Sequence, residues 1–186
     1  MLRLARTLEM LAAALERLAI PYAIVGSVAS STRGSYRATE DIDVLARISG
    51  DHAEALAQAL GSDWYADGHQ IRAAIGAGRA FNLIYIPLSQ KVDLFPVVDE
   101  FCAAELERAT TVPVPAAGAE YRVASAEDVV LAKLQWYKAG GEISERQWTD
   151  IVNVIRATPG MDWAYVEGWA PRLGVAALLA RAKSES

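Results

Sequence analysis

Cysteine is nearly absent from this sequence, and long apolar runs are absent altogether. The single cysteine among 186 residues, Cys102, excludes an intramolecular disulfide and is typical of a reducing compartment. Cys102 lies in a helix-like run, where we expect a small buried apolar residue rather than a nucleophile. No apolar run approaches the roughly 18 residues that span a bilayer, and residues 1–18 lack the features of a signal peptide. We therefore expect a cytoplasmic protein with no membrane partner.

Positive charge is also scarce. The chain has 18 Lys and Arg against 23 Asp and Glu, which gives a net charge of −5. This balance disfavours broad nucleic-acid binding, and with it a DNA- or RNA-binding regulator. The two histidines, His52 and His69, have no metal-ligand spacing and are expected at the surface. An acidic cleft that binds a divalent metal is compatible with this composition.

The first 100 residues alternate between helical and strand patterns, which predicts an α/β (α+β) domain with a small mixed sheet and helices on one face. Apolar residues make up 53% of the chain, enough for one compact core. The runs at 81–86 and 91–95 are separated by four residues and predict an antiparallel hairpin. The other expected elements are helices at 1–18, 27–33 and 51–60 and strands at 22–25 and 41–46.

The last third of the sequence predicts a helical part. Residues 110–124 are rich in Pro, Ala and Gly and have no helical period, so they are the best candidate for a boundary. Ser125 and Ser144 each begin a capping-box pattern that opens a helix. We therefore predict a core domain at 1–115 and a helical C-terminal subdomain at 116–186.

Three aspartates are candidate ligands of a divalent metal ion. Asp41 and Asp43 are separated by one residue of a strand, so their side chains emerge on the same face. Asp93 lies between Val92 and Leu94 on a hairpin strand, where an unpaired carboxylate is costly. Carboxylates on adjoining strands are the ligands that Mg²⁺ prefers, together with substrate phosphates. Two such ions can activate a hydroxyl and stabilise a leaving pyrophosphate.

A glycine-serine turn lies just upstream. Gly26 lets backbone approach a ligand closely, and Ser27 offers a hydroxyl. The helix expected after them directs free N–H groups at an anion. The turn is therefore predicted to hold nucleotide phosphates while the aspartates hold metal ions.

These motifs together resemble the nucleotidyltransferase superfamily of the DNA polymerase β type. The family pattern reads here as Val25-Gly26-Ser27, a spacer at 28–40, Asp41-Ile42-Asp43 and a later strand with Asp93. "YRATEDIDVL" and "SAEDVVLAKLQWYK…RQWTDIVNVI" look like the branch related to AbiEii-type toxins. The resemblance covers nearly the whole chain, but only the aspartate motif is specific about chemistry.

The resemblance implies a nucleotidyltransferase fold and transfer of a nucleoside monophosphate from an NTP to a hydroxyl acceptor. Gly26 and Ser27 would contact the phosphates, and Asp41, Asp43 and Asp93 would bind two Mg²⁺ or Mn²⁺ ions. Asp93 would also orient or deprotonate the acceptor hydroxyl. Lys133 would meet the triphosphate, and Asp150 would position Lys133 or the acceptor. The acceptor is open: an RNA end such as tRNA, a protein side chain or a small molecule.

Several alternatives remain at this point. Lys133 is expected on a helix that is apolar on nearly all sides. In the alternative, its side chain simply extends along this surface to place the ammonium group in solvent. Asp150 and Arg146 are four residues apart and would form an ordinary exposed ion pair. Arg37 and Thr39 would brace the loop or contact the nucleotide. For the whole protein, the alternative is a catalytically silent module that binds a partner, such as the cognate antitoxin in a toxin–antitoxin pair.

Overall fold

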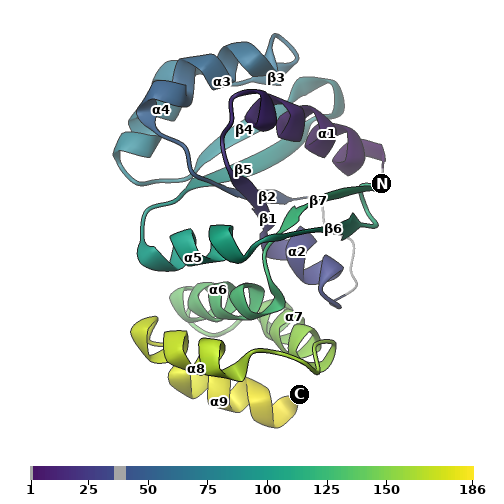
Figure 1. Cartoon of the computed structure of the whole chain (residues 1–186), viewed down its shortest axis with the longest axis vertical. Helices are drawn as coiled ribbons and strands as arrows, with labels where there is room; N and C mark the ends of the chain where they lie inside the picture. The colour runs from purple at the N-terminus through teal and green to yellow at the C-terminus, as the bar shows by residue number, and fades with distance from the viewer. Residues whose placement is uncertain (1, 36–40) are drawn as a thin grey trace.

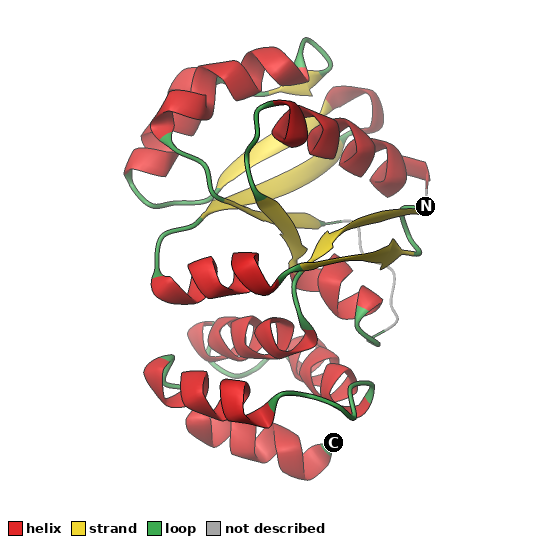
Figure 2. Cartoon of the chain, in the orientation of Figure 1, coloured by secondary structure: helices red, strands yellow, loops and turns green. Residues whose placement is uncertain are grey.

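The computed structural model describes residues 2–35 and 41–186, which form a sheet-containing part and a helical part (Figures 1 and 2). The sheet has seven strands in the order β3-β4-β5-β2-β1-β7-β6. The strands are β1 (Tyr22–Val25), β2 (Ile42–Ala46), β3 (Trp64–Tyr65), β4 (Phe81–Tyr85), β5 (Gln90–Pro96), β6 (Thr110–Val114) and β7 (Ala119–Val123). The predicted mixed sheet is confirmed, because β2 pairs with β5 in parallel and with β1 in antiparallel orientation.

The two hairpins of the sheet differ in how far the sequence predicts them. The antiparallel pairing of β4 with β5 was expected because only four residues separate the two strand-like runs, and it is confirmed. Residues 110–124, the candidate boundary, contain the whole antiparallel hairpin β6–β7, and β7 joins the sheet beside β1. The sequence analysis did not predict these strands, because pairing with β1 supplies order that a segment rich in Pro and Gly does not signal by itself. The division at residue 115, which cuts this hairpin, stays a prediction.

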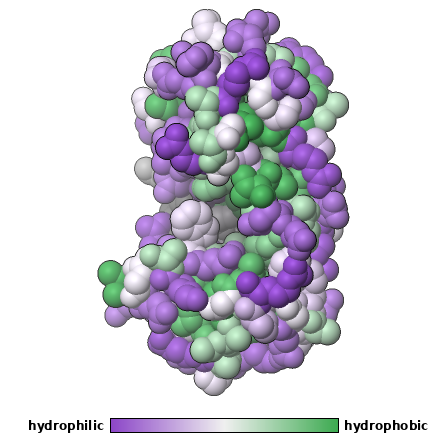
Figure 3. All heavy atoms as spheres, turned by 90° about the vertical axis from the view of Figure 1, so that its left-hand side faces the viewer, coloured by the Kyte–Doolittle hydropathy of each residue, from purple (hydrophilic) through white to green (hydrophobic). Residues whose placement is uncertain are grey.

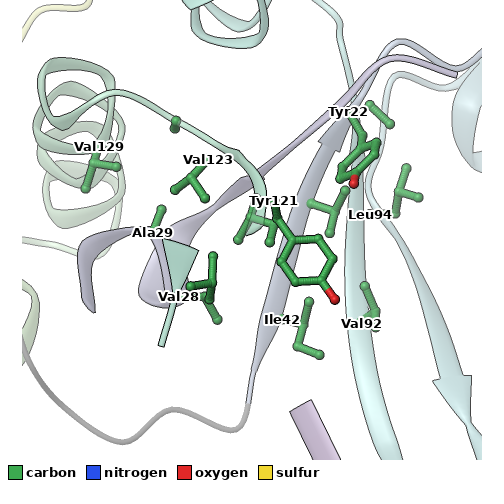
Figure 4. Close-up of a cluster of buried hydrophobic side chains, with 14 of the residues drawn as sticks. Tyr22, Val28, Ala29, Ile42, Val92, Leu94, Tyr121, Val123 and Val129 are labelled. Atoms are coloured by element: carbon green, nitrogen blue, oxygen red, sulfur yellow. The ribbon is translucent and has the colours of Figure 1, made fainter. Parts of the chain in front are cut away.

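One face of the sheet is covered by α1 (Leu2–Arg17), α3 (Ala53–Leu60) and α4 (Gly68–Gly76), as expected (Figure 1). Ile42, Val92 and Leu94 are at most 1% exposed and belong to the main core, with Tyr22 and Tyr121 beside them (Figure 4). Because side chains alternate along a strand, residues 43 and 93 must emerge on the opposite face.

The opposite face carries a smaller apolar cluster. Ala23 and Leu45 of the sheet pack there against Leu106 and Ala109, at the end of α5 (Glu100–Arg108). Helix α5 is capped by Asp99, whose carboxylate accepts the backbone N–H of Cys102. The prediction of helices on one face thus describes α1, α3 and α4, whereas α5 lies on the other face and leaves part of it open.

The helical part contains α6 (Ala126–Ala139), α7 (Glu145–Arg156), α8 (Trp163–Arg172) and α9 (Ala176–Glu185). The Ser125 and Ser144 hydroxyls accept backbone N–H groups at the starts of α6 and α7, so both predicted caps are confirmed. One cluster of buried apolar side chains runs from α1 to α9 and joins this part to the sheet. Short helices also include α2 (Gly26–Thr32) and the 3-10 turns η1 (Gly50–His52) and η2 (Ile86–Leu88). None of the helices in the described part of the chain combines the length and apolar character needed to cross a bilayer.

Candidate functional site

Asp43 and Asp93 lie side by side on the open face of the sheet. They are register partners in the parallel pair β2–β5, so their side chains emerge on the same face at neighbouring positions. Burial and the Asp93 carboxylate raise the pKa of Asp43 from 3.8 to about 6, against the backbone N–H of Ser27 that hydrogen-bonds it. The sequence prediction that these two carboxylates meet is therefore confirmed by the register.

Asp41, the third predicted ligand, precedes β2 and is exposed, and its charge also raises the pKa of Asp43. Within residues 2–35 and 41–186, no three Asp, Glu, His or Cys side chains are gathered closely enough to hold a metal ion. Lys91 Nζ lies 2.8 Å from Asp93 Oδ2, and the Lys91 side chain is 46% exposed. A cation on a half-exposed side chain thus already pairs with this group of carboxylates. The carboxylate oxygens and their mutual repulsion fit a divalent ion.

Gly26 is the point where the turn meets the carboxylates. Its φ is +59°, a conformation that favours glycine. A Cβ on Gly26 would lie 2.0 Å from Asp43 Oδ2, so any side chain here collides with the carboxylate. Together with the Ser27 N–H bond, this contact fixes the glycine-serine turn directly against Asp43. The sequence motif therefore reflects close packing of the glycine-serine turn on the Asp43 carboxylate.

Lys133 and Asp150 form a buried ion pair between α6 and α7. Lys133 Nζ lies 2.9 Å from Asp150 Oδ2, and the two side chains are 10% and 2% exposed. The Ser35 hydroxyl donates to Asp150 Oδ1 at 2.8 Å and is itself buried. The alternative of an exposed pair between Asp150 and Arg146 is wrong, because Asp150 is buried. The alternative in which Lys133 only extends to solvent is also wrong, because its ammonium group pairs with Asp150 in the interior. Ser35 was not predicted, since no motif marks a serine just after a short helix.

Asp43, Lys133 and the glycine-serine turn line one pocket of about 530 Å³. Its floor is the open face of the sheet, its side is α5 and its roof is α6, and Figure 3 shows the molecule hollowed between the two parts. Besides Asp43, Lys133 and the turn, the lining residues are mostly apolar. They are Val25, Leu45, Phe95, Phe101, Cys102, Glu105, Val129, Ala132, Gln135, Trp136, Ala139 and Gln147. The pocket therefore has a polar end at Asp43, Ser27 and Lys133 and mostly apolar walls, which also contain Glu105, Gln135 and Gln147.

Two pocket-lining residues of α5 extend the predicted site. Burial raises the pKa of the Cys102 thiol to about 12, which agrees with the expectation that it is not a nucleophile. Glu105 is 5% exposed, and burial with the nearby Asp128 and Asp99 raises its pKa to about 8. The sequence did not reveal Glu105, because an acidic residue on a helix is normally solvated. The predicted nucleotide contacts Arg37 and Thr39 lie outside the described residues.

The chain resembles known proteins in its fold and not in its sequence. No family model matches the chain, and no curated protein matches it. The solution structure of the antibiotic-resistance factor ANT(2'')-Ia is similar over 96% of each chain, with 20% identity and a TM-score of 0.53. The crystal structure of ANT(2'')-Ia with adenylyl-2''-tobramycin is similar over 92% of this chain and 97% of that one, with 17% identity and a TM-score of 0.54. The chain therefore shares its mixed α/β fold with ANT(2'')-Ia.

Proposed function

We propose that this protein is a metal-dependent nucleotidyltransferase. It transfers a nucleoside monophosphate from an NTP to a hydroxyl acceptor and releases pyrophosphate. The observation that carries the proposal is the register of Asp93 with Asp43, and Asp43 lines a pocket together with the glycine-serine turn and Lys133. Each of these features is common by itself, but their convergence in one pocket matches the needs of a nucleotide triphosphate.

The phosphates would lie at the polar end of the pocket. Gly26 has no side chain to obstruct them, Ser27 provides a hydroxyl, and Lys133 provides a positive charge from α6. Asp150 pairs with Lys133 and holds its ammonium group in place, and Ser35 holds Asp150. A charge-assisted contact between Lys133 and phosphate would cost little side-chain entropy, because Asp150 already holds the ammonium group.

Asp43 and Asp93 would hold the Mg²⁺ or Mn²⁺ ions, two in the active complex, together with the nucleotide phosphates. Asp41, which is not gathered with them in the structure, would complete the set when metal binds. The raised pKa of Asp43 and the ion pair of Asp93 with Lys91 support a preference for positive charge at this place. Bound metal would neutralise the phosphates and lower the pKa of the acceptor hydroxyl. Asp93 would orient that hydroxyl and accept its proton, while Lys91 leaves Asp93 for the solvent.

The acceptor is a hydroxyl on an RNA end such as tRNA, on a protein or on a small molecule. ANT(2'')-Ia, which shares the fold, has been solved with adenylyl-2''-tobramycin, an adenylylated small molecule. This neighbour supports a small-molecule hydroxyl as the first acceptor class to test. Assignment to the AbiEii-like branch, with a cognate antitoxin as partner, rests on the sequence motifs and stays a hypothesis.

The experiment is a transfer assay with NTPs labelled at the α-phosphorus. Wild-type protein is incubated with Mg²⁺ or Mn²⁺ and, separately, with total RNA, with cell protein and with a small-molecule extract. Label that moves to one fraction supports transfer and identifies the acceptor class. Binding of NTP without label transfer in any fraction, also with both metals present, would favour the catalytically silent module instead.

A further inference from the structure

Glu105 is a buried carboxyl group that the phosphate and metal chemistry does not use. It lines the pocket from α5, next to Phe101 and Cys102, and is 5% exposed. In the described part of the chain its Oε1 atom is buried and makes no hydrogen bond. A buried polar atom without a partner destabilises a protein, so its retention in a pocket wall indicates a partner that arrives with the ligand.

The polar neighbours of Glu105 do not hydrogen-bond its Oε1 atom. Asp128 on α6 is engaged by Tyr165, Ser125 and Arg108. Asp99, before α5, accepts the backbone N–H of Cys102. Both neighbours are acids, and together with burial they keep Glu105 protonated at neutral pH. A protonated carboxyl both donates and accepts a hydrogen bond, which is the pattern along the edge of a nucleobase.

Apart from Gln135 and Gln147, the rest of the pocket wall suits a flat, apolar ring. Phe95, Phe101 and Trp136 line it, and the rings of Phe95 and Trp136 meet edge to face with centroids 6.2 Å apart. A sugar or a polyamine would need a polar partner for each of its many hydroxyl or amino groups. A nucleobase needs aromatic or aliphatic contact on its faces and a hydrogen-bonding group at its edge, and this end of the pocket offers both.

We propose that Glu105 hydrogen-bonds the base edge of the bound nucleotide and thereby determines which NTP the protein selects. This inference rests on the proposed function, which places the triphosphate at Gly26, Ser27 and Lys133. The base then extends along α6 between Phe101 and Trp136 toward α5. Glu105 acts in recognition alone, and no bond is made or broken at its carboxyl group.

The test is calorimetric binding of ATP, GTP, CTP and UTP with Mg²⁺ to wild-type protein, Glu105→Leu and Glu105→Gln. Inorganic tripolyphosphate is the probe without a base. Glu107→Leu is the matched control, because Glu107 lies on the same helix but is 69% exposed and pairs with Arg47. We expect wild type to prefer one NTP at least tenfold and Glu105→Leu to lose about tenfold for that NTP, the effect of one buried hydrogen bond.

The same data decide the outcome. Glu105→Leu should bring the four NTPs within about threefold of one another and leave tripolyphosphate binding unchanged, and Glu105→Gln should alter the order of preference. Folded Glu105→Leu and Glu105→Gln proteins with wild-type selectivity would overturn the inference alone. A wild type that binds tripolyphosphate but does not discriminate among the NTPs would also overturn it. A wild type that binds neither tripolyphosphate nor any NTP would overturn the proposed function as well.

Discussion

The ion pair between Lys133 and Asp150 offers a sharp test of how the helical part supports the site. Replacing Asp150 with Ala leaves the Lys133 ammonium group buried without its carboxylate, which lies 2.9 Å away in the folded protein. It also removes the acceptor of the Ser35 hydroxyl. Breaking a buried pair in this way costs about 3–5 kcal/mol, because one charge remains uncompensated.

For a chain of this length, each kcal/mol lowers the melting temperature by about 2–4 °C. We therefore expect Asp150→Ala to melt roughly 10 °C below wild type, and Asp150→Asn, which keeps a hydrogen-bonding oxygen, to melt between them. An NTP with Mg²⁺ should raise the melting temperature of Asp150→Ala and recover part of this loss, because the triphosphate supplies the negative charge that Lys133 lacks.

The assay is thermal unfolding with and without Mg²⁺ and NTP, followed by circular dichroism. Glu107→Ala is the control: it breaks an exposed pair with Arg47 and should shift the melting temperature by less than about 2 °C. An Asp150→Ala protein that melts with wild type would refute the buried pair. Loss of stability that NTP does not reduce at all would separate the pair from the nucleotide site.

Three further predictions follow from single contacts. Gly26→Val should abolish NTP binding and lower the melting temperature, because its side chain collides with Asp43 Oδ2, whereas Ser27→Ala should weaken calorimetric binding by only about 1 kcal/mol. Lys91→Met should tighten Mn²⁺ binding several-fold in calorimetry, because Lys91 competes for Asp93; unchanged affinity would argue against that competition. Folding raises the pKa of Glu105 from 4.5 to about 8, so the folded state favours the protonated carboxyl. The free energy of unfolding therefore falls as pH rises between those two values. Glu105→Gln should therefore gain stability over wild type in urea unfolding at pH 8 relative to pH 5; an equal difference at both pH values would contradict the shift.

The sequence predicts the carboxylate pair and the hairpin well because both depend on local alternation. Asp43 and Asp93 each lie between apolar residues, and the strand period alone places them on the face opposite the core. Their pairing in register then follows from neighbouring strands. The caps at Ser125 and Ser144 were likewise visible, since a cap needs only residues close in sequence.

The parts that the sequence did not predict depend on contacts between distant segments. Thr110–Val123 forms a hairpin in the sheet because β7 pairs with β1, about 100 residues earlier in the chain. Ser35 gains its role only when α7 brings Asp150 to it, and Glu105 only when α6 buries it. Lys91 was read simply as a strand residue, although it pairs with Asp93 two positions later on the same face. No single-sequence pattern marks such contacts.

The most direct test of the central claim is pyrophosphate release by wild type and Asp43→Asn. Asparagine keeps the size of Asp43 but lacks its charge, so the fold and the Gly26 packing should survive. With Mg²⁺, NTP and the acceptor fraction that receives label, wild type should release pyrophosphate in proportion to transferred nucleotide. Asp43→Asn should lose at least about a thousandfold in rate, which corresponds to about 4 kcal/mol of transition-state stabilisation. A folded Asp43→Asn protein that releases pyrophosphate at the wild-type rate would contradict the account.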